Sequence, residues 1–373
     1  MTRCAGILIL FLSHIAVIPS HASEVLVYDI TRLSSSTSRT IPLMSGQRVT
    51  FQQPVPRGGR VLFKDWMPRA NWTHRATYEM LSPDSRVLES LEARFPPAGL
   101  GKSTPLISGK AISSRLVTNA DFKLDTFQGT MKVKDPKHFY AVLINGAGND
   151  RHWNDLSFLY RVLTQIYGYD PANIFAADSN YIKEHADFDG DGRPDILYET
   201  TLSGVRDLMH QLAKTITPED QLVVAVDDHG GLNLSGDVVI ALADDLMTAG
   251  EFGKLITNIP AKRVLSIFEP CFSGGLVRPV VSEQRVAMAA AANNESSWQT
   301  ADDMWDAFIF PVISGFARQL PDGTPIAIGS GDPIQVNAKQ AFIYALGMDT
   351  AAESPFLEAA PNSGFATTIG LGF

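Results

Sequence analysis

The sequence predicts an α/β protein in which a mostly parallel sheet is flanked by helices, preceded by a smaller β-rich region. From His138 onward, short apolar runs alternate with segments whose apolar residues recur at helical spacing, the pattern of repeated strand–helix units. The run 139–144 is apolar throughout, as expected of a strand covered on both faces. Between residues 23 and 135, Gly, Pro and Ser instead separate short strand-like pieces.

Residues 1–22 have the features of a secretory signal peptide. A basic start at Met1–Arg3 precedes an apolar stretch through Ile18, and Ser20-His21-Ala22 has the small-x-small pattern of a cleavage site. We therefore expect cleavage after Ala22 and export to the periplasm or the medium. No other run of about 18 apolar residues is present, so no membrane insertion is expected.

Residues 23–135 are interpreted as a β-rich accessory region or propeptide. Strands are expected at 24–28, 48–51 and 60–63. No group of residues in this region forms a recognisable catalytic or binding motif.

Residues 136–373 are predicted to form the α/β domain. Strands are expected at 139–144, 174–176, 222–226, 264–268 and 286–290. Helices are expected around 156–166, 205–216, 305–316 and 337–346. In such sheets ligands bind beyond the carboxyl ends of the strands.

Composition excludes some classes of function and draws attention to one cysteine. The chain has 373 residues and a formal net charge of −9 without a basic patch, which argues against a nucleic-acid partner. Of its two cysteines, Cys4 would leave with the signal peptide. Exported proteins usually pair their cysteines, so the lone Cys271 is an inert core residue, an intermolecular link or a reactive thiol.

Polar residues follow three of the expected strands, and two of them suggest nucleophilic catalysis. His229 follows one strand and Cys271 another, and a histidine partner is the simplest route to a thiolate. Gly230 and Cys271 are the natural backbone N–H donors to a developing oxyanion. The alternative is a turn histidine and a core cysteine. The preceding Asp227-Asp228 pair is expected to be solvated or structural, and zinc is disfavoured because it needs at least three protein ligands.

Several motifs together resemble the legumain family of cysteine peptidases, which share the caspase-like fold. Asp228-His229-Gly230 follows one apolar strand, and Glu269-Pro270-Cys271-Phe272-Ser273-Gly274 follows another. Asn149-Asp150-Arg151-His152 resembles the Asn-x-Arg-His of the family, and 289–297 resembles its Ala-Ala-Asn-x-x-Glu-Ser-Ser stretch. The resemblance runs from about His138 to at least Asp306.

The resemblance implies roles for individual residues. Cys271 would be the nucleophile, His229 the acid–base and Asn149 the residue that orients the histidine. The residues implied to bind substrate form the primary specificity pocket and its wall: Arg151, Glu269, Ser296, Ser297 and Asp306.

The specificity pocket has a coherent chemistry. A guanidinium can donate to a carboxamide oxygen while a carboxylate accepts from its NH₂ group, which suits Asn and, when protonated, Asp. Asp302 or Asp303 could line the pocket in place of Asp306. For Arg151 and Glu269 the alternative to a pocket is a surface ion pair. Pro270 and Phe272 depart from the family pattern, which lowers the expectation of strict Asn specificity.

A second site is visible without reference to any family. The stretch 187–195 places Asp187, Asp189, Asp191 and Asp195 at positions 1, 3, 5 and 9 of a calcium-loop pattern, with Gly190 and Gly192 between them. Such loops bind Ca²⁺ through carboxylates and a backbone carbonyl, here that of Arg193. The glutamate expected at position 12 is replaced by tyrosine, so an acidic turn is the alternative. We expect a structural calcium ion and no catalytic cofactor.

The leading hypothesis is an exported cysteine endopeptidase of bacterial type that acts on peptides or proteins through a thioester, cleaving after Asn or Asp. It would lack the long C-terminal prodomain of animal and plant members. Peptide ligation is a variant of the same chemistry. The alternative from another class is an inactive, calcium-stabilised binding protein on the same fold. The oligomeric state is left open.

Overall fold

The computed structural model describes residues 26–33, 40–43, 47–65, 76–97, 105–107, 115–126, 131–146, 149–179, 186–233, 235–328, 335–360 and 364–372. The predicted signal peptide lies outside these ranges, so export stays a prediction. Within them, no helix combines the length and the apolar character needed to cross a bilayer.

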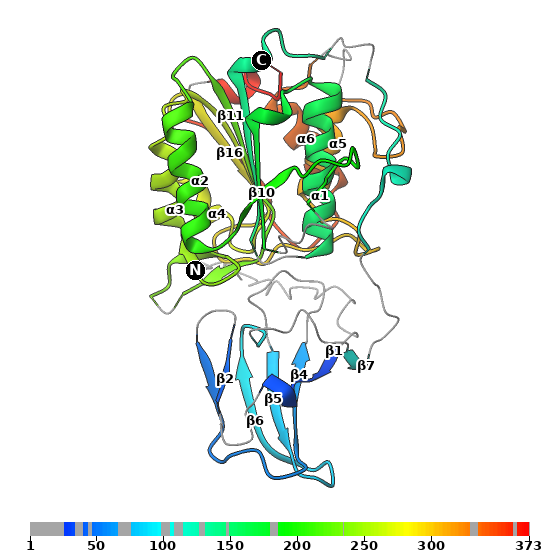
Figure 1. Ribbon diagram of the computed structural model, residues 1–373, viewed down its shortest axis with the longest axis vertical. Coiled ribbons are helices and arrows are strands. Elements are labelled where there is room, and N and C mark those ends of the chain that lie inside the picture. Colours follow the sequence, from blue (N-terminus) through cyan, green and yellow to red (C-terminus); the bar gives the residue numbers. More distant parts are fainter. Residues whose placement is uncertain are drawn as a thin grey trace, which may run out of the picture.

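A seven-stranded sheet forms the centre of the larger part of the molecule (Figure 1). Its strand order is β10-β9-β8-β11-β15-β16-β17. All neighbours run parallel except β16 and β17, which are antiparallel. The strands are β8 (Phe139–Asn145), β9 (Ile174–Asp178), β10 (Ile196–Glu199), β11 (Gln221–Val226), β15 (Arg263–Phe268), β16 (Arg285–Ala289) and β17 (Phe356–Glu358).

Helices cover both faces of this sheet, which confirms the predicted fold class. The helices α2 (Leu202–Thr215), α3 (Ala249–Thr257) and α4 (Gly274–Val277) lie on one face, and α1 (Asp150–Arg161), α5 (Ile309–Ala317) and α6 (Ala338–Met348) lie on the other (Figure 1). Along β11, Val223 and Ala225 belong to the core beneath α1 and α5, whereas Val224 and Val226 belong to the core beneath α2 and α3. Alternate side chains of one apolar strand therefore fill two cores.

Shorter elements complete this part of the chain. A small antiparallel sheet comprises β12 (Gly230–Leu232), β13 (Val238–Ala241) and β14 (Leu246–Thr248). A π-helical turn η6 (Val162–Ile166) extends α1. The short 3-10 helices are η1 (Thr31–Leu33), η3 (Asn119–Asp121), η5 (Pro136–His138), η7 (Pro171–Asn173) and η9 (Phe365–Thr367).

The first part of the chain builds a separate antiparallel sheet with its own core. Its order is β6-β5-β4-β1-β7, and Phe51, Phe63 and Tyr78 are buried against it. The strands are β1 (Leu26–Asp29), β4 (Arg60–Asp65), β5 (Ala76–Leu81), β6 (Val87–Ala93) and β7 (Pro105–Ile107), beside a hairpin of β2 (Thr40–Pro42) and β3 (Arg48–Thr50). Figure 1 shows this N-terminal sheet below the α/β part of the molecule.

The helix expected from residue 305 begins later, at Ile309. Trp305 and Asp306 belong to a tight turn in which the Thr300 N–H donates to the Trp305 carbonyl at 2.8 Å, and Gln299 bridges to Asp306. The apolar pattern alone does not reveal this turn, because Trp305 lies three and four residues before the apolar Phe308 and Ile309, which is helical spacing. The strands β10 and β17 and the helix α3 were not predicted.

Candidate active site

The residues singled out by the sequence gather at one edge of the sheet because their strands are neighbours. β8, β11 and β15 are adjacent and parallel, so the segments after them leave at the same edge. His229 lies between β11 and β12, and Cys271 follows β15. A Cβ atom added to Gly230 would meet the Cys271 carbonyl oxygen at 2.2 Å and the Pro270 Cβ at 2.8 Å. Only glycine therefore fits at position 230, and the Pro270 side chain is part of the surface that Gly230 contacts.

Cys271 is enclosed and its thiol is held by the opposite wall. The side chain is 0% exposed, and the Ser297 N–H donates to Sγ at 3.3 Å. Burial raises the pKa of the Cys271 thiol to about 12, while hydrogen bonds from Ser296 and Ser297 act in the opposite direction. With this raised pKa the resting thiol keeps its proton, so a thiolate would have to form with the help of a base.

The turn after Cys271 has an unusual backbone. Phe272 has a φ of 63°, in the left-handed region that side chains rarely adopt. Its N–H donates to the Glu295 carbonyl at 2.8 Å, and the Ser273 N–H donates to the Pro270 carbonyl at 2.9 Å. These bonds fix the direction in which the chain leaves the cysteine.

His229 is nearly buried and contacts a second histidine. It is 7% exposed, and its backbone N–H donates to Asp228 Oδ1 at 2.6 Å. Its ring meets that of His152 edge-on, with centroids 5.0 Å apart. His152 lies in the first turn of α1, whose N-cap residue is Asn149. The Asn149 side chain does not cap this helix, so its amide is not used in holding α1.

Arg151 and Asp306 form a buried ion pair. Arg151 Nε donates to Asp306 Oδ1 at 2.9 Å, and the two side chains are only 6% and 0% exposed. Asp302, which competes with Asp306 in the sequence, is exposed and accepts from the Thr300 hydroxyl at 2.7 Å within the turn. The structure thus brings Asp306 to Arg151 and leaves Asp302 in a turn, while the charge of Asp303, the other competitor, also acts on Arg151.

Glu269 is fully buried with one oxygen unsatisfied. Its Oε2 accepts from the Ile309 N–H at 2.8 Å, whereas Oε1 has no hydrogen-bond partner. Burial and the neighbouring carboxyl groups, beginning with Glu353 and Asp306, raise the pKa of Glu269 well above its usual value. A buried carboxyl oxygen without a partner is costly unless something binds to it.

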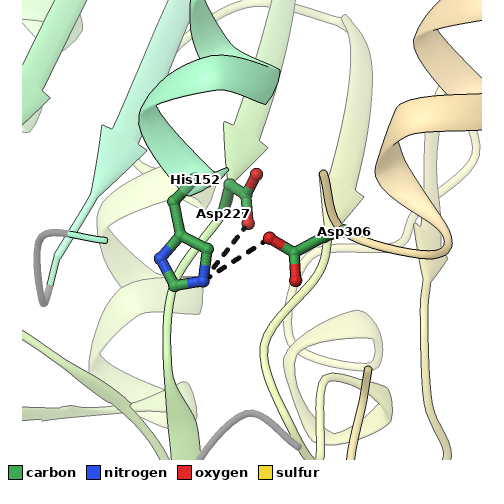
Figure 2. A group of neighbouring side chains, drawn as sticks. All are labelled: His152, Asp227 and Asp306. Atoms are coloured by element: carbon green, nitrogen blue, oxygen red, sulfur yellow. Dashed lines mark ion pairs between the residues drawn. The ribbon is translucent and has the colours of Figure 1, made fainter. Parts of the chain in front are cut away.

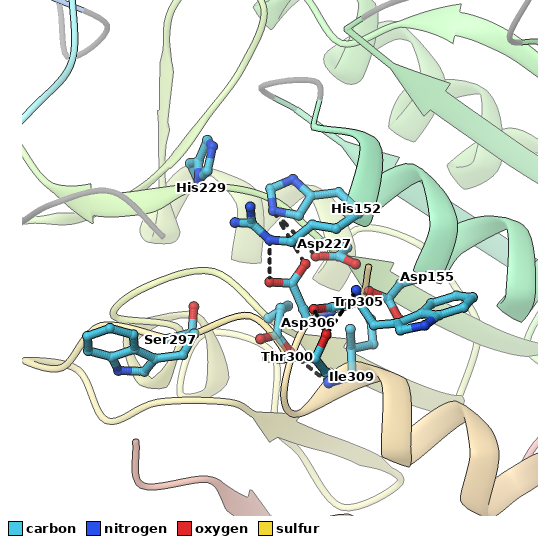
Figure 3. Close-up of polar contacts among 12 residues, drawn as sticks. His152, Asp155, Asp227, His229, Ser297, Thr300, Trp305, Asp306 and Ile309 are labelled. Atoms are coloured by element: carbon cyan, nitrogen blue, oxygen red, sulfur yellow. Dashed lines mark hydrogen bonds and ion pairs between the residues drawn. The ribbon is translucent and has the colours of Figure 1, made fainter. Parts of the chain in front are cut away.

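Two further carboxyl groups surround Asp306, as Figure 3 shows. The Asp155 Oδ2 accepts from the Asp306 N–H at 2.8 Å. Asp227 is 0% exposed, and its carboxyl group faces that of Asp306. Burial, followed by the charge of Asp306, raises the pKa of both Asp155 and Asp227. Of the two alternatives for the Asp227-Asp228 pair, the solvated one is excluded because both residues are buried, and the structural one remains.

His152 points between two of these acids (Figure 2). Its Nε2 lies 3.5 Å from Asp306 Oδ2 and 3.9 Å from Asp227 Oδ1. Burial, Arg151 and His229 lower the pKa of His152 well below its usual value, so the ring is neutral. The three side chains lie close enough to share a cation. The Arg151 guanidinium donates to the other oxygen of Asp306 and so already compensates the negative charge that a cation would neutralise.

The predicted calcium loop brings three of its four carboxylates together. Oxygens of Asp187, Asp189 and Asp195 all lie within 4.8 Å of one another. Asp191 stands outside this group, and its Oδ1 accepts from the Arg193 N–H at 2.7 Å. Burial raises the pKa of Asp195 to about 6 and also raises that of Asp189. Hard oxygen donors crowded in this way fit a Ca²⁺ ion with at least three protein ligands.

Sequence reasoning missed three polar residues of the site. His152 was part of a recognised motif without a role, and Asp155 lies one helical turn after Arg151. Glu353 comes from the segment after α6, and its Oε2 accepts from the Trp298 N–H at 2.7 Å beside Ser297. Helical spacing from Arg151 could have indicated Asp155. No sequence signal connects Glu353 to the segment around Ser297 and Trp298, which lies some 50 residues earlier in the chain.

The backbone segments that carry a thiol and an imidazole touch beside a group of buried polar side chains, and such a combination is compatible with acyl transfer by a cysteine nucleophile. Residues 197–309 match the sequence model of the Peptidase C13 family. This segment includes His229 and Cys271, and the match supports a cysteine peptidase. No curated protein matches the chain.

Solved structures with similarity to the chain include two of distant sequence. Protein GSU0716 from Geobacter sulfurreducens is 12% identical with a TM-score of 0.40, over 61% of this chain and 96% of that one. Caspase-1 from Spodoptera frugiperda is 11% identical with a TM-score of 0.39, over 61% of this chain and 88% of that one.

Proposed function

We propose that the chain is an exported cysteine endopeptidase that cleaves peptide bonds after Asn or Asp. The observation that carries the proposal is the contact between the His229-Gly230 and Pro270-Cys271 segments, which brings the backbone next to the candidate base against the carbonyl of the candidate nucleophile. The family match over the same residues supports it.

The chemistry follows from these groups. Cys271 Sγ attacks the peptide carbonyl carbon while His229 accepts the thiol proton, and the C–N bond then breaks as His229 passes that proton to the departing amine. Water, deprotonated by His229, attacks the thioester and releases the acid. The N–H groups of Gly230 and Cys271 stabilise the oxyanion in both steps. The Asn149 amide orients the imidazole.

The raised pKa of Cys271 shapes this mechanism. A thiol that is protonated at rest must lose its proton during attack, so a neutral His229 is required at that moment. The bound substrate places its carbonyl carbon where the forming thiolate can attack it. The Ser297 N–H, which donates to Sγ, stabilises the negative charge on the sulfur.

The specificity pocket suits a carboxamide. Arg151 donates to the side-chain oxygen, and the unsatisfied Oε1 of Glu269 accepts from the NH₂ group. Because its pKa is raised, Glu269 can also carry a proton and donate it to a carboxylate, which admits Asp at lower pH. Ser296 and Ser297 form the wall next to the thiol, and Asp306 holds Arg151 in place.

Calcium has a supporting role in the proposal. Asp187, Asp189 and Asp195 would hold the ion, with the Arg193 carbonyl as a further ligand, and would stiffen the loop before β10. This loop lies outside the Cys271 pocket, so calcium contributes to stability and takes no part in the chemistry.

The test is a panel of fluorogenic peptides that differ only in the residue before the cleaved bond. Cleavage after Asn or Asp is expected, with loss of activity in Cys271→Ser and His229→Ala and full activity in the matched control His210→Ala, whose histidine is exposed on α2. A preference for Lys or Arg would overturn the pocket assignment. Binding of these peptides without cleavage would favour the inactive binding protein.

A further inference from the structure

A cavity of about 420 Å³ lies between the N-terminal sheet and the candidate active site. Gln47, Arg94 and Phe95 line it from the N-terminal side. The α/β part contributes Leu232, Asn233, Gly236 and Phe272. Neither part of the chain forms this cavity alone.

Two residues that line the cavity belong to the segments that carry the candidate site. Phe272 directly follows Cys271 in the chain and has a left-handed backbone. Leu232 ends β12, the strand that begins immediately after His229. Both residues therefore connect the cavity to the two groups that perform the proposed chemistry.

The N-terminal sheet approaches this face of the molecule at a second point. Burial, Asp65 and then Asp303 raise the pKa of Tyr28 in β1 to about 12. Asp303 also acts on Arg151, the guanidinium of the specificity pocket. The charge of Asp303 therefore acts both on the N-terminal sheet and on the pocket arginine, and Phe95 brings the same sheet to the cavity beside β12.

Proton transfer assigns the cavity to one side of the substrate. His229 must protonate the departing amine, so the peptide beyond the cleaved bond leaves along the His229 side of Cys271. The Ser297 N–H contacts the thiol itself. Leu232 at the end of β12 lines the cavity, and β12 begins directly after His229, so we assign the cavity to the leaving side.

We propose that this cavity binds the leaving-side segment of the substrate and that the N-terminal sheet supplies one of its walls, through Phe95 and Arg94. The inference rests on the proposed peptidase function and deepens it by defining a second specificity determinant. It makes the N-terminal sheet a working part of the substrate cleft.

The lining predicts the chemistry of the bound segment. Phe95, Phe272 and Leu232 offer apolar surface, and Arg94 is the one ionisable side chain among the lining residues that the structure describes. Arg94 is exposed, and no ion pair joins it to another residue that the structure describes. A leaving segment with an acidic side chain two or three residues beyond the cleaved bond would pair with this guanidinium.

The experiment uses the full chain and octapeptides with Asn before the cleaved bond and Glu, Gln or Lys at the second and third positions after it. The ratio of kcat/KM for the Glu and Lys peptides is measured in the wild type, in Arg94→Glu and in the matched control Arg57→Glu. Arg57 is exposed on the same part of the chain but does not line the cavity. Since an exposed ion pair is worth little, we expect the wild type to favour Glu by roughly threefold to fivefold. Arg94→Glu should reverse the preference, and Arg57→Glu should preserve it.

Each other outcome separates the two proposals. Equal cleavage of all three peptides by the wild type, or a preference that Arg94→Glu leaves unchanged, overturns the leaving-side assignment while leaving the peptidase intact. A rise in the cleavage of every peptide in Arg94→Glu would identify the N-terminal sheet as a cover and also overturn it. Absence of Cys271-dependent cleavage of any peptide is a failure of the proposed function itself.

Discussion

Gly230 lies so close to the Cys271 carbonyl that a single added carbon would meet this oxygen at 2.2 Å. The residue after the candidate base and the candidate nucleophile are therefore held together by backbone contact, independently of the His229 and Cys271 side chains. Such a contact sets the geometry of the site before any substrate arrives.

Gly230→Ala should disrupt this geometry. The new Cβ atom would meet backbone oxygen and the Pro270 ring, neither of which can rotate away, so β12 or the Cys271 turn must shift. We expect peptidase activity to fall by at least 100-fold, because misplacing catalytic groups by about 1 Å costs a factor of this order. The measurement is kcat/KM on the Asn peptide, together with the melting temperature.

Gly250→Ala is the matched control for this substitution. Gly250 lies in α3 with nothing within 4 Å of an added Cβ atom. Alanine should stabilise that helix by about 0.5–1 kcal/mol and leave activity unchanged. If Gly230→Ala were as active as Gly250→Ala, the contact would have no catalytic importance.

Asp306→Asn should weaken both folding and substrate recognition. It removes the charge that compensates the buried Arg151 guanidinium, and breaking a buried ion pair on one side costs about 3–5 kcal/mol. A displaced Arg151 should also raise KM for the Asn peptide. Urea denaturation measures the free energy of unfolding, and steady-state kinetics measures KM.

Asp302→Asn serves as the control because this neighbouring acid is exposed in the turn and asparagine can keep its contact with Thr300. It should change neither quantity appreciably. Equal effects of the two substitutions would contradict the assignment of Asp306 to the pocket.

Much of the sheet was predictable because its strands are buried on both faces. Continuous apolar runs such as 139–144 and 222–226 have few alternatives, and the structure places both in the central sheet. The neighbouring strand ends then explain why the segments that carry Arg151, Glu269 and Cys271 leave the sheet at the same edge. The order of the strands was not encoded in any local pattern, because it depends on packing between distant segments.

The parts that the sequence did not reveal are those in which polar residues are buried. Asp227 is a short acidic side chain next to a histidine, and nothing local distinguishes a buried carboxyl from a solvated one. Glu353 reaches Trp298 from the far end of the chain, where no motif marked it. The cavity between Phe95 and Phe272 joins two regions that appeared unrelated in sequence.

Removal of calcium should destabilise the protein without changing its specificity. With calcium at about 100 times its dissociation constant, binding adds about 2.7 kcal/mol, which corresponds to a melting temperature higher by roughly 5–10 °C. Chelation with EDTA should reverse this, and Asp189→Asn should reduce the response. Differential scanning calorimetry provides the measurement. Glu219→Gln, an exposed acid elsewhere, is the control, and an equal calcium response in both variants would contradict the site.

Asp227→Asn should make the protein more stable at neutral pH. Burial raises the pKa of Asp227 in the folded state above the value of about 3.9 expected for an unfolded chain. Below that value both states are protonated, and the contribution of Asp227 to stability is fully present. As the pH rises, the unfolded state releases the proton first, so the free energy of unfolding falls by up to about 1.4 kcal/mol per pH unit until the folded pKa is passed.

Asparagine resembles the protonated acid and cannot ionise, so the Asp227→Asn variant should lose this part of the pH dependence. Urea denaturation at pH 4 and pH 7 should give similar stabilities for wild type and variant at pH 4 and a more stable variant at pH 7. The exposed Asp207 in α2 provides the control substitution Asp207→Asn, which should follow the wild type at both pH values. A variant that is less stable than the wild type at pH 7 would mean that Asp227 is ionised in the fold and contributes its charge to the neighbouring His152 and Arg151.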